Sequence, residues 1–399
     1  MNNETMKKSA MMKMVAARLG AVKKASDEPV KDLYSYAPNK LALALHPHAQ
    51  HLTIKKIIEH SPDFKTFVFE PNAAKGTEQL AWFSAGQYLV IAVNVGGKLY
   101  SRPYSISSAP RDTLDGEIAI SVKRVDGGII SNFILENWKE GEEVIASAPL
   151  GEFTYEPLRD AKTIIGIAGG SGITPFYSLT RAILDGDEDC NLILLYGSRT
   201  LKDAVFSEQI KAIAEKTDKV KLVNILSDEK KKGAEHGFID AKLIKKYAPE
   251  GEPYSLFLCG PQAMYRFVDK EIEILGLRRK FVRHELFGEY FHPEEDEAYS
   301  GDIKKVFQLT VRIAGKEQTV KAAADTSLLR SMEAAGIKAP SDCRSGRCGW
   351  CHSQLLAGEV YIPESVDGRR AADKEFGYIH PCCAFPLSDI TLDVPPMPY

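Results

Sequence analysis

Residues 340–360 read PSDCRSGRCGWCHSQLLAGEV and contain three cysteines in the spacing Cys-x4-Cys-x2-Cys. A pair of adjacent cysteines follows after 30 residues. Two irons bridged by two sulfides need four thiolates, and a tight loop can supply three of them. Glycines inside this loop let backbone N–H groups approach and hydrogen-bond the sulfurs. The spacing therefore predicts a [2Fe–2S] centre, and the cysteines of this region are Cys343, Cys348, Cys351, Cys382 and Cys383.

Two other interpretations of these cysteines compete with this one. A structural zinc site usually takes two separated short-spaced pairs of ligands. A chance group of free thiols would not explain why the cysteines are spaced in this way. The chain holds seven cysteines, an odd number gathered mostly at one end, which makes a poor disulfide framework. Reduced thiols at a cluster imply a reducing compartment, so we expect the protein in the cytoplasm.

Length and composition exclude several classes of protein. At ~150 residues per domain, 399 residues predict two to three domains. Hydrophobic residues make up 44% and charged residues 26%, which are ordinary globular values. The net charge of −3 provides no basic field for nucleic acid or an anionic membrane. No run approaches the ~18 apolar residues of a spanning helix, so we expect no transmembrane segment.

The first 49 residues differ from the rest, with eight Lys or Arg against four Asp or Glu. Residues 6–25 suit a short basic helix, but basic residues interrupt every apolar run, so the apolar region of a signal peptide is missing. We interpret residues 1–49 as a basic extension, either solvated or lying on the next domain. A helix that binds a membrane surface or a partner is the alternative.

The residue pattern then changes along the chain and divides it into further regions. Residues 50–157 hold β-rich runs separated by turn residues, which predicts an antiparallel β-barrel. Residues 158–292 alternate strands with helices, which predicts a parallel α/β sheet. Residues 293–304 contain an acidic run and predict a linker. Residues 305–399 form a third domain, which carries the cysteine region.

Hydrophobic periodicity predicts individual elements within these regions. The helices expected are Ser131–Asn137, Pro175–Leu184, Val205–Lys216, Asp240–Tyr247 and Ser327–Ala335. The strands expected are Leu52–Ile58, Phe64–Glu70, Tyr88–Val93, Glu117–Arg124, Glu143–Ala148, Thr163–Ala168, Leu192–Tyr196, Lys221–Leu226, Ser255–Cys259, Val306–Ile313 and Gln318–Ala322.

A second motif, Arg102-Pro103-Tyr104-Ser105, falls on a predicted strand of the barrel. A flavin needs an aromatic wall beside its ring, a donor near N5 and positive charge for its phosphates. Tyr104 can supply the wall, Ser105 the hydroxyl, and Arg102 a bidentate charge. A pair of glycines precedes a helix start at Ser131, where free amides suit a phosphate. The alternative is a tight turn that only caps a structural helix.

A third motif, GIAGGSGITP at residues 166–175, follows a buried strand and opens a helix. Glycines let the backbone approach a pyrophosphate, and the helix N-terminus favours its charge. The spacing is not the G-x-G-x-x-G of the Rossmann fingerprint. Cys259-Gly260-Pro261 ends a later parallel strand, at the edge where α/β sheets bind ligands. A buried structural cysteine is the alternative for Cys259.

Together with GYIHPCCAFPLSD at residues 377–389, the cysteine region resembles a plant-type ferredoxin domain of β-grasp fold. In this alignment Cys382 matches the fourth ligand and Cys383 is its neighbour. The three motifs, in this order, resemble the ferredoxin–NADP reductase superfamily in its version with a C-terminal ferredoxin domain. The resemblance covers residues 51–399. It implies a multidomain protein with an antiparallel flavin barrel, an α/β nucleotide-binding domain and an iron–sulfur domain.

The resemblance also implies roles for individual residues. The flavin would contact Arg102, Pro103, Tyr104, Ser105 and Phe287, and its phosphates Gly128, Ser131 and Asn132. The nicotinamide nucleotide would contact Gly169, Gly170, Gly172, Ile173, Thr174, Ser198, Arg199, Asp203, Cys259, Gly260 and Pro261. The hydride-transfer site would include Ser105, Cys259 and Glu285. The cluster ligands would be Cys343, Cys348, Cys351 and Cys382.

The activity implied by the resemblance is that of an NAD(P)H:acceptor oxidoreductase. Electrons would pass from NAD(P)H through flavin and the [2Fe–2S] cluster to a redox acceptor protein that docks near the ferredoxin domain. The resemblance favours FAD over FMN, and weakly NADH over NADPH. The alternatives are a non-catalytic electron-transfer subunit whose flavin is reduced by a partner, and a scaffold with degenerate sites. The acidic run at 294–297 would let the third domain move between flavin and partner.

Overall fold

The computed structural model describes residues 12–19, 35–285 and 289–396. The chain divides into two compact units, Met1–Leu45 and His46–Tyr399. In the first unit residues 12–19 are helical, inside the basic helix expected over 6–25, and the rest of that expectation lies outside the described residues. A second helix in this unit is α2 (Ala37–Leu45). Across the described ranges, no helix has the length and apolar character needed to cross a membrane.

An antiparallel sheet begins the second unit, as expected, and it is curled. Its six strands lie in the order β4-β3-β6-β1-β2-β5. A bridge between Ile106 and Ile120 brings the chain after β4 back to β5, so the two edges of the sheet approach each other. Alternate residues point into one apolar core, which includes Phe67 and Leu89. The strands are β1 (Gln50–Ser61), β2 (Phe64–Pro71), β3 (Tyr88–Val95), β4 (Lys98–Ser105), β5 (Ile118–Lys123) and β6 (Glu143–Ala146).

The Arg-Pro-Tyr-Ser motif forms the last four residues of β4. Pro103 cannot donate a ladder hydrogen bond, and it is accommodated because β4 is an edge strand of its sheet. The helix expected from Ser131 begins two residues earlier, as α3 (Ile129–Asn137), directly after Gly128. The glycine pair therefore lies at the start of this helix.

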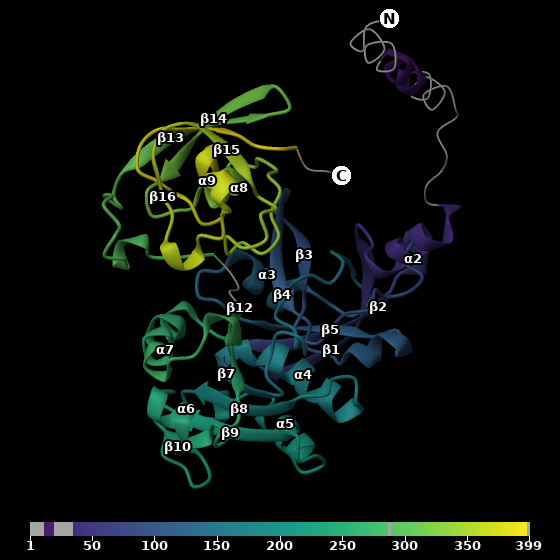
Figure 1. Cartoon of the computed structure of the whole chain (residues 1–399), viewed down its shortest axis with the longest axis vertical. Coiled ribbons are helices and arrows are strands. Elements are labelled where there is room, and N and C mark those ends of the chain that lie inside the picture. The colour runs from purple at the N-terminus through teal and green to yellow at the C-terminus, as the bar shows by residue number, and fades with distance from the viewer. Residues whose placement is uncertain (1–11, 20–34, 286–288, 397–399) are drawn as a thin grey trace, which may run out of the picture. The chain divides into compact units, whose positions relative to one another are not determined.

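A parallel sheet follows, in the order β10-β9-β8-β7-β11-β12. The strand expected over Thr163–Ala168 is β7 (Thr163–Gly169), which is buried along its whole length. Figure 1 shows α4 and α5 on one side of this sheet and α6 and α7 on the other. The other elements are β8 (Asn191–Ser198), β9 (Val220–Leu226), β10 (Glu235–His236), β11 (Tyr254–Cys259), β12 (Val282–Glu285), α4 (Thr174–Asp185), α5 (Ser207–Ala214), α6 (Ala241–Tyr247) and α7 (Gln262–Leu275).

The strand order of the parallel sheet reverses beside β7. Strands β8 and β9 lie on one side of it, whereas β11 lies on the other. Ligands of such sheets bind outside the carboxyl ends of the strands, at the point of reversal. The glycine motif follows β7, and Cys259 ends β11. The fold therefore brings both motifs to the switch point.

Three elements of this domain, α7, β12 and the two-residue strand β10, are not among the expected elements. The buried residues of α7 are Tyr265, Val268 and Ile272, which recur at helical spacing but form a narrow stripe among charged residues. The helix expected over Val205–Lys216 starts only at Ser207, because Phe206 adopts a left-handed backbone with φ of 66°.

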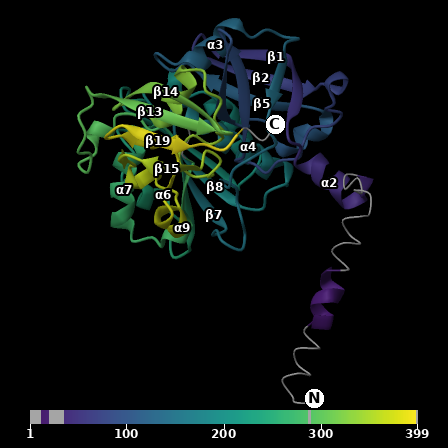
Figure 2. The same cartoon turned by 90° about the horizontal axis from the view of Figure 1, so that it is seen from above.

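The third domain has a mixed sheet in the order β14-β13-β19-β15-β17. Figure 2 shows β13, β14, β15 and β19 gathered in green to yellow. The expected helix is α8 (Leu328–Ala334); the Ser327 hydroxyl caps it, and Gly336 follows it with φ of 79°. The core contains Leu309, Phe385 and, from before the acidic run, Tyr290. The strands are β13 (Val306–Ile313), β14 (Lys316–Ala323), β15 (Ser353–Ala357), β17 (Tyr378–Ile379) and β19 (Ile390–Asp393).

Specific contacts hold the acidic run between the second and third domains. Glu295 forms an ion pair with Arg266 of α7. Asp296 accepts hydrogen bonds from Tyr290 Oη at 2.5 Å and from Tyr361 Oη at 2.8 Å. These contacts restrain the segment for which the composition predicts mobility, and that mobility stays a prediction.

Candidate functional site

Four cysteine side chains come together in the third domain. Cys351 Sγ and Cys382 Sγ lie 3.4 Å apart, and the N–H of Cys348 donates to Cys343 Sγ at 3.3 Å. In the described ranges, no group of three or more His, Cys, Asp or Glu side chains is placed around a single metal-ion position. The four cysteines instead fall into two pairs, which suits two bridged irons. Three more backbone N–H groups donate to these sulfurs at 3.3–3.5 Å, those of Ser345, Gly346 and Trp350.

The neighbouring Cys383 has two backbone carbonyls as hydrogen-bond partners. Its Sγ lies 3.5 Å from His380 O and 3.8 Å from Val366 O. Gly346 has φ of 74°, and a Cβ there would lie 2.7 Å from Cys383 Sγ, so the loop needs a glycine at this point. The geometry favours Cys382 as the fourth ligand and Cys383 as a packed neighbour.

The cysteine loop has one side against the barrel and one side exposed. Cys343 packs with Tyr88 and Val90 of β3 and with Leu150. Cys348 is exposed, whereas the other three predicted ligands are buried. A cluster held here would therefore face the barrel through Cys343 and solvent through Cys348.

The predicted flavin strand lies next to this contact. Ser105 is opposite Tyr88 in the β3–β4 register, so the Ser105 backbone and the residue that contacts Cys343 are direct neighbours. Ser105 is buried, and Tyr104 packs against the barrel core. Burial raises the pKa of the Tyr104 phenol well above its usual range. Tyr104 is thus held in place and neutral, which is compatible with its predicted role beside a flavin ring.

The start of α3 suits a phosphate. No side chain in the described part of the chain caps its first turn, so the backbone N–H groups there are open to an anion. A Cβ on Gly128 would meet the Ser131 hydroxyl at 2.8 Å. Ser131 Oγ accepts from the N–H of Val125 at 3.2 Å, and Asn132 Oδ1 accepts from Arg124 at 3.1 Å. The predicted phosphate residues Gly128, Ser131 and Asn132 therefore share one compact turn.

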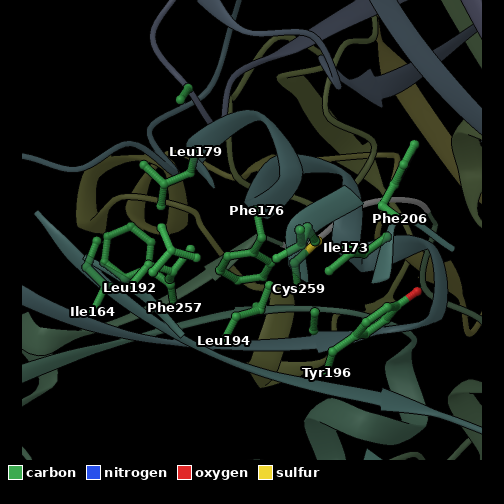
Figure 3. Close-up of a cluster of buried hydrophobic side chains, with 14 of the residues drawn as sticks. Ile164, Ile173, Phe176, Leu179, Leu192, Leu194, Tyr196, Phe206, Phe257 and Cys259 are labelled. Carbon is green, nitrogen blue, oxygen red and sulfur yellow. The ribbon is translucent and has the colours of Figure 1, made fainter. Parts of the chain in front are cut away.

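Close packing explains the glycines of the nucleotide turn. A Cβ on Gly172 would lie 2.0 Å from the carbonyl oxygen of Cys259, and one on Gly169 would lie 2.6 Å from Met264 Sδ. Within the predicted turn of Gly169, Gly170, Gly172, Ile173 and Thr174, it is Gly169 and Gly172 that pack against the Cys259-Gly260-Pro261 segment. Figure 3 shows the Cys259 side chain beside Ile173 and Phe176. From the sequence alone, these glycines are explained by the close approach of a pyrophosphate. The packing against the Cys259 segment is a second explanation, which the motif alone does not reveal.

The predicted hydride-transfer residues converge from three elements. Cys259 is opposite Glu285 in the β11–β12 register. A Cβ on Gly151 would lie 3.9 Å from Glu285 Oε2 and 2.9 Å from the Tyr88 ring. Tyr88 in turn is opposite Ser105. A continuous row of neighbours therefore runs from Cys259 through Glu285 to Ser105, and at Tyr88 it meets Cys343.

Burial controls the charge of this row. It raises the pKa of Glu285 to about 8, with a smaller contribution from the negative charge of Cys343. Burial likewise raises the pKa of the Cys259 thiol well above its usual range. Near neutral pH both side chains are therefore uncharged proton carriers beside the predicted ring-binding surface. The site has the low charge that a neutral flavin ring favours.

Comparison with known proteins decides the family. Residues 51–155 match the oxidoreductase FAD-binding domain, 167–270 the oxidoreductase NAD-binding domain, and 311–387 the 2Fe-2S iron-sulfur cluster binding domain. The solved structure of phthalate dioxygenase reductase, described as a modular structure for electron transfer from pyridine nucleotides to [2Fe-2S], is similar over 87% of this chain and 98% of that chain. Its sequence identity is 25% and its TM-score 0.62. The chain belongs to the ferredoxin–NADP reductase superfamily, with a C-terminal [2Fe–2S] domain.

Two curated relatives span nearly the whole reductase. The glycine betaine monooxygenase reductase subunit of Chromohalobacter salexigens is 27% identical over 85% of this chain and 93% of its own. The ferredoxin reductase component of the 3-ketosteroid-9-alpha-monooxygenase of Rhodococcus rhodochrous is 28% identical over 86% of this chain and 97% of its own. The chain is thus an NAD(P)H-dependent oxidoreductase that uses FAD and a [2Fe–2S] cluster and passes electrons to a separate redox enzyme.

The adenosine end of the predicted nucleotide site is more open. Ser198 ends β8 at the same edge of the sheet as the glycine turn. Arg199 is 82% exposed and pairs with Asp228 at 3.0 Å. Asp203 accepts from the N–H of Thr200 at 3.1 Å and from its hydroxyl at 2.7 Å. Asp203 therefore caps the turn that carries Arg199 and has a local structural task.

Some residues of the reductase site lie beyond the motifs. Phe287, predicted to contact the flavin, lies outside the described residues. Tyr88 and Lys123 were not predicted, and neither was Glu289, which lies outside the site itself and contacts the flavin motif only through Arg102. Lys123 Nζ would lie 3.5 Å from a Cβ on Gly170, which places a cation at the nucleotide turn. The segment Gly86-Gln87-Tyr88, which leads into the strand paired with the flavin motif, was the available signal for Tyr88, whereas Lys123 and Glu289 belong to no motif.

Proposed function

We propose that the reductase supplies electrons to a terminal oxygenase component. Relatives that span nearly all of the chain carry names of oxygenase reductase components. The observation that supports delivery to a separate protein is the two-sided placement of the cysteine loop, with Cys343 on the barrel and Cys348 exposed. We place the protein in a reducing compartment, the cytoplasm, because the ligands must be thiolates.

The chain's own residues hold and align the cofactors. When bound, the flavin converts the two-electron hydride of reduced nicotinamide into single electrons that the cluster can accept. Tyr104 provides the wall for the ring, Ser105 a buried hydroxyl, and Arg102 a positive charge. The turn at 169–174 and Cys259 orient the nicotinamide toward this surface. Alignment is their main contribution, since near-attack geometry removes much of the barrier.

The exposed side of the cysteine loop is our candidate docking site for the oxygenase. The Trp350 side chain is 40% exposed, and the backbone N–H of Trp350 donates to Cys348 Sγ at 3.4 Å. Arg347 is exposed beside it. A partner that covers Trp350 would come within two residues of the exposed ligand Cys348, and exposed aromatic and arginine residues are typical interface anchors.

Replacement of Trp350 tests this docking site. With the oxygenase captured from the native host, Trp350→Ala is expected to slow its reduction about tenfold, because an anchor side chain is lost. Flavin reduction by NADH should be unchanged. The matched control is Trp82→Ala in the barrel, since Trp82 is 41% exposed. Equal rates for both variants would place the docking site elsewhere, and capture of a partner that NADH plus reductase cannot reduce would contradict the proposed function.

We further propose NADH as the preferred donor. Asp228 forms an ion pair with Arg199. The 2′-phosphate of NADPH, if bound at this arginine, would therefore be repelled by the Asp228 carboxylate. We expect kcat/KM for NADH to exceed that for NADPH by at least about tenfold. Asp228→Asn should narrow this ratio, while Asp218→Asn at the opposite edge should not. A higher kcat/KM with NADPH in the unaltered protein would show the preference to be wrong.

A further inference from the structure

Five charged residues from three parts of the chain meet between the barrel and the third domain. We call them the interdomain charge cluster: Arg102, Glu289, Arg330, Glu333 and Arg344. Arg102 belongs to the flavin motif on β4, and Arg344 follows the first predicted cluster ligand. Arg330 and Glu333 lie on α8, and Glu289 follows the end of β12 by four residues. The interdomain charge cluster therefore includes a residue of the flavin motif and a residue of the cysteine loop.

One part of this cluster lies wholly within the third domain. Arg344 Nη1 and Nη2 each donate to a carboxylate oxygen of Glu333 at 2.7 Å, a bidentate arrangement. The Arg344 side chain has no exposed surface, and its backbone adopts a left-handed conformation with φ of 58°. This backbone is unfavourable for a residue with a side chain. The fold thus maintains a strained position to bury this guanidinium beside Cys343.

Glu289 joins that pair to the barrel. Its carboxylate accepts from Arg344 Nε at 2.9 Å and also from Arg344 Nη2. It pairs with Arg330 at 3.2 Å and with Arg102 at 3.6 Å. Arg102 also approaches Glu333 at 3.5 Å and donates to Ser101 O at 2.8 Å. Arginines of both domains therefore converge on Glu289, and Arg102 and Arg344 also meet at Glu333.

Burial makes this tie strong and specific. Only 6% of the Glu289 side chain is exposed, against 21% of Arg102. Although burial acts to raise the pKa of Glu289, the positive charges of Arg344, Arg102 and Arg330 lower it overall, so the carboxylate is ionised. Removing one partner of such a group leaves an uncompensated buried charge. Salt screens buried pairs much less than exposed ones.

Two further hydrogen-bonding contacts follow the same boundary. Lys98 Nζ donates to the carbonyl of Ala334 at the end of α8, and the hydroxyls of Ser101 and Ser341 lie 3.0 Å apart. All of these contacts align β4 with α8 and the loop that leads from it to Cys343. They lie beside the contact of Cys343 with Tyr88.

We propose that Glu289 is a positioning residue for electron transfer: by joining Arg102 of the flavin strand to Arg344 of the cysteine loop, it holds Cys343 against Tyr88 and so sets the separation between flavin and cluster. The Arg344–Glu333 pair keeps the loop itself in shape, and Glu289 adds the attachment to the barrel.

The test compares Glu289→Gln with Glu289→Asp in the full holoprotein. Anaerobic mixing with NADH separates flavin reduction from cluster reduction by their absorbance. We expect Glu289→Gln to leave the flavin phase within twofold of normal and to slow the cluster phase at least fivefold. Glu289→Asp, which keeps the charge, should restore part of the rate. Trypsin cleavage at the exposed Lys304–Lys305 should become faster in Glu289→Gln without any substrate present. The matched control is Glu317→Gln, whose carboxylate pairs with Arg312 in an exposed hairpin of the same domain.

Three outcomes would overturn the proposal. In the first, Glu289→Gln matches Glu317→Gln in both the cluster phase and cleavage. In the second, cluster absorbance is lost, which would assign Glu289 to folding of the loop. In the third, both phases slow equally, which would assign it to the nucleotide site. If Glu289→Gln does not fold, Glu289→Asp alone decides, because its shorter side chain must slow the cluster phase and not the flavin phase.

Discussion

A Cys382→Ser protein is expected to lose the visible absorbance and the iron of its cluster, whereas a Cys383→Ser protein is expected to keep both. Cys382 Sγ lies 3.4 Å from Cys351 Sγ and accepts the N–H of Gly346 at 3.3 Å. The Cys383 thiol instead faces the carbonyls of His380 and Val366. A serine hydroxyl fits there, but it is a poor replacement for a thiolate on iron.

Iron analysis, absorbance and electron delivery together measure this effect. Cys382→Ser should lower electron delivery to a one-electron protein acceptor by about 100-fold or more, because the last carrier is missing. Its flavin should still be reduced by NADH, which serves as the internal control for folding of the other two domains. Loss of the cluster in Cys383→Ser, with its retention in Cys382→Ser, would reverse the ligand assignment.

Gly172→Ala is expected to disable the nucleotide-binding domain. Its Cβ would lie 2.0 Å from the carbonyl oxygen of Cys259 and 2.7 Å from the nitrogen of Gly260, and both are backbone atoms that cannot rotate away. Overpacking of this kind costs about 3 kcal/mol or more. For a domain of this size that corresponds to a fall in Tm of roughly 10 °C. Separation of the turn from β11 should also slow flavin reduction by NADH by about 100-fold, since hydride transfer depends on alignment.

Gly197→Ala is the matched control for this substitution. Gly197 lies near the end of the neighbouring strand β8, and its Cβ would lie 3.5 Å from the carbonyl oxygen of Ala168, an ordinary contact. Its Tm should therefore be within about 2 °C of the unaltered protein. Differential scanning calorimetry and stopped-flow absorbance measure the two effects. A Gly172→Ala protein with normal Tm and normal flavin reduction would show that the turn can move away from β11.

The cysteine ligands could be predicted because their chemistry is local. Three of the four lie within nine residues, and the glycine that the loop needs at position 346 is part of the same stretch. The choice between Cys382 and Cys383, in contrast, could not be made from local spacing. It depends on which thiol turns toward Cys351, and that is decided by the carbonyls of His380 and Val366. Cys382 and Cys383 differ by only one residue in their spacing from Cys351. From the sequence, only the resemblance to plant-type ferredoxin domains could favour one of them as the ligand.

The role of Arg102 could be predicted only in part. The motif indicated a cation for flavin phosphates, which depends on neighbours in the strand. Its contacts with Glu289 and Glu333 join residues separated by about 190 and 230 positions, and no local pattern connects them. The same is true of Gly172, where the space for a side chain is closed by Cys259, far along the chain. Long-range packing of this kind is visible only once the sheets have assembled.

The burial of Tyr290 in the third core bears on how such modular enzymes can be recombined. This residue precedes the acidic run, yet it packs against Phe385, and its hydroxyl binds Asp296 within that run. A chimera joined at residue 305 would leave a gap where this ring belongs and remove the carboxylate that binds Tyr361. An exchangeable electron-transfer module therefore has to carry its upstream tyrosine with it, and the natural crossover point lies ahead of residue 290.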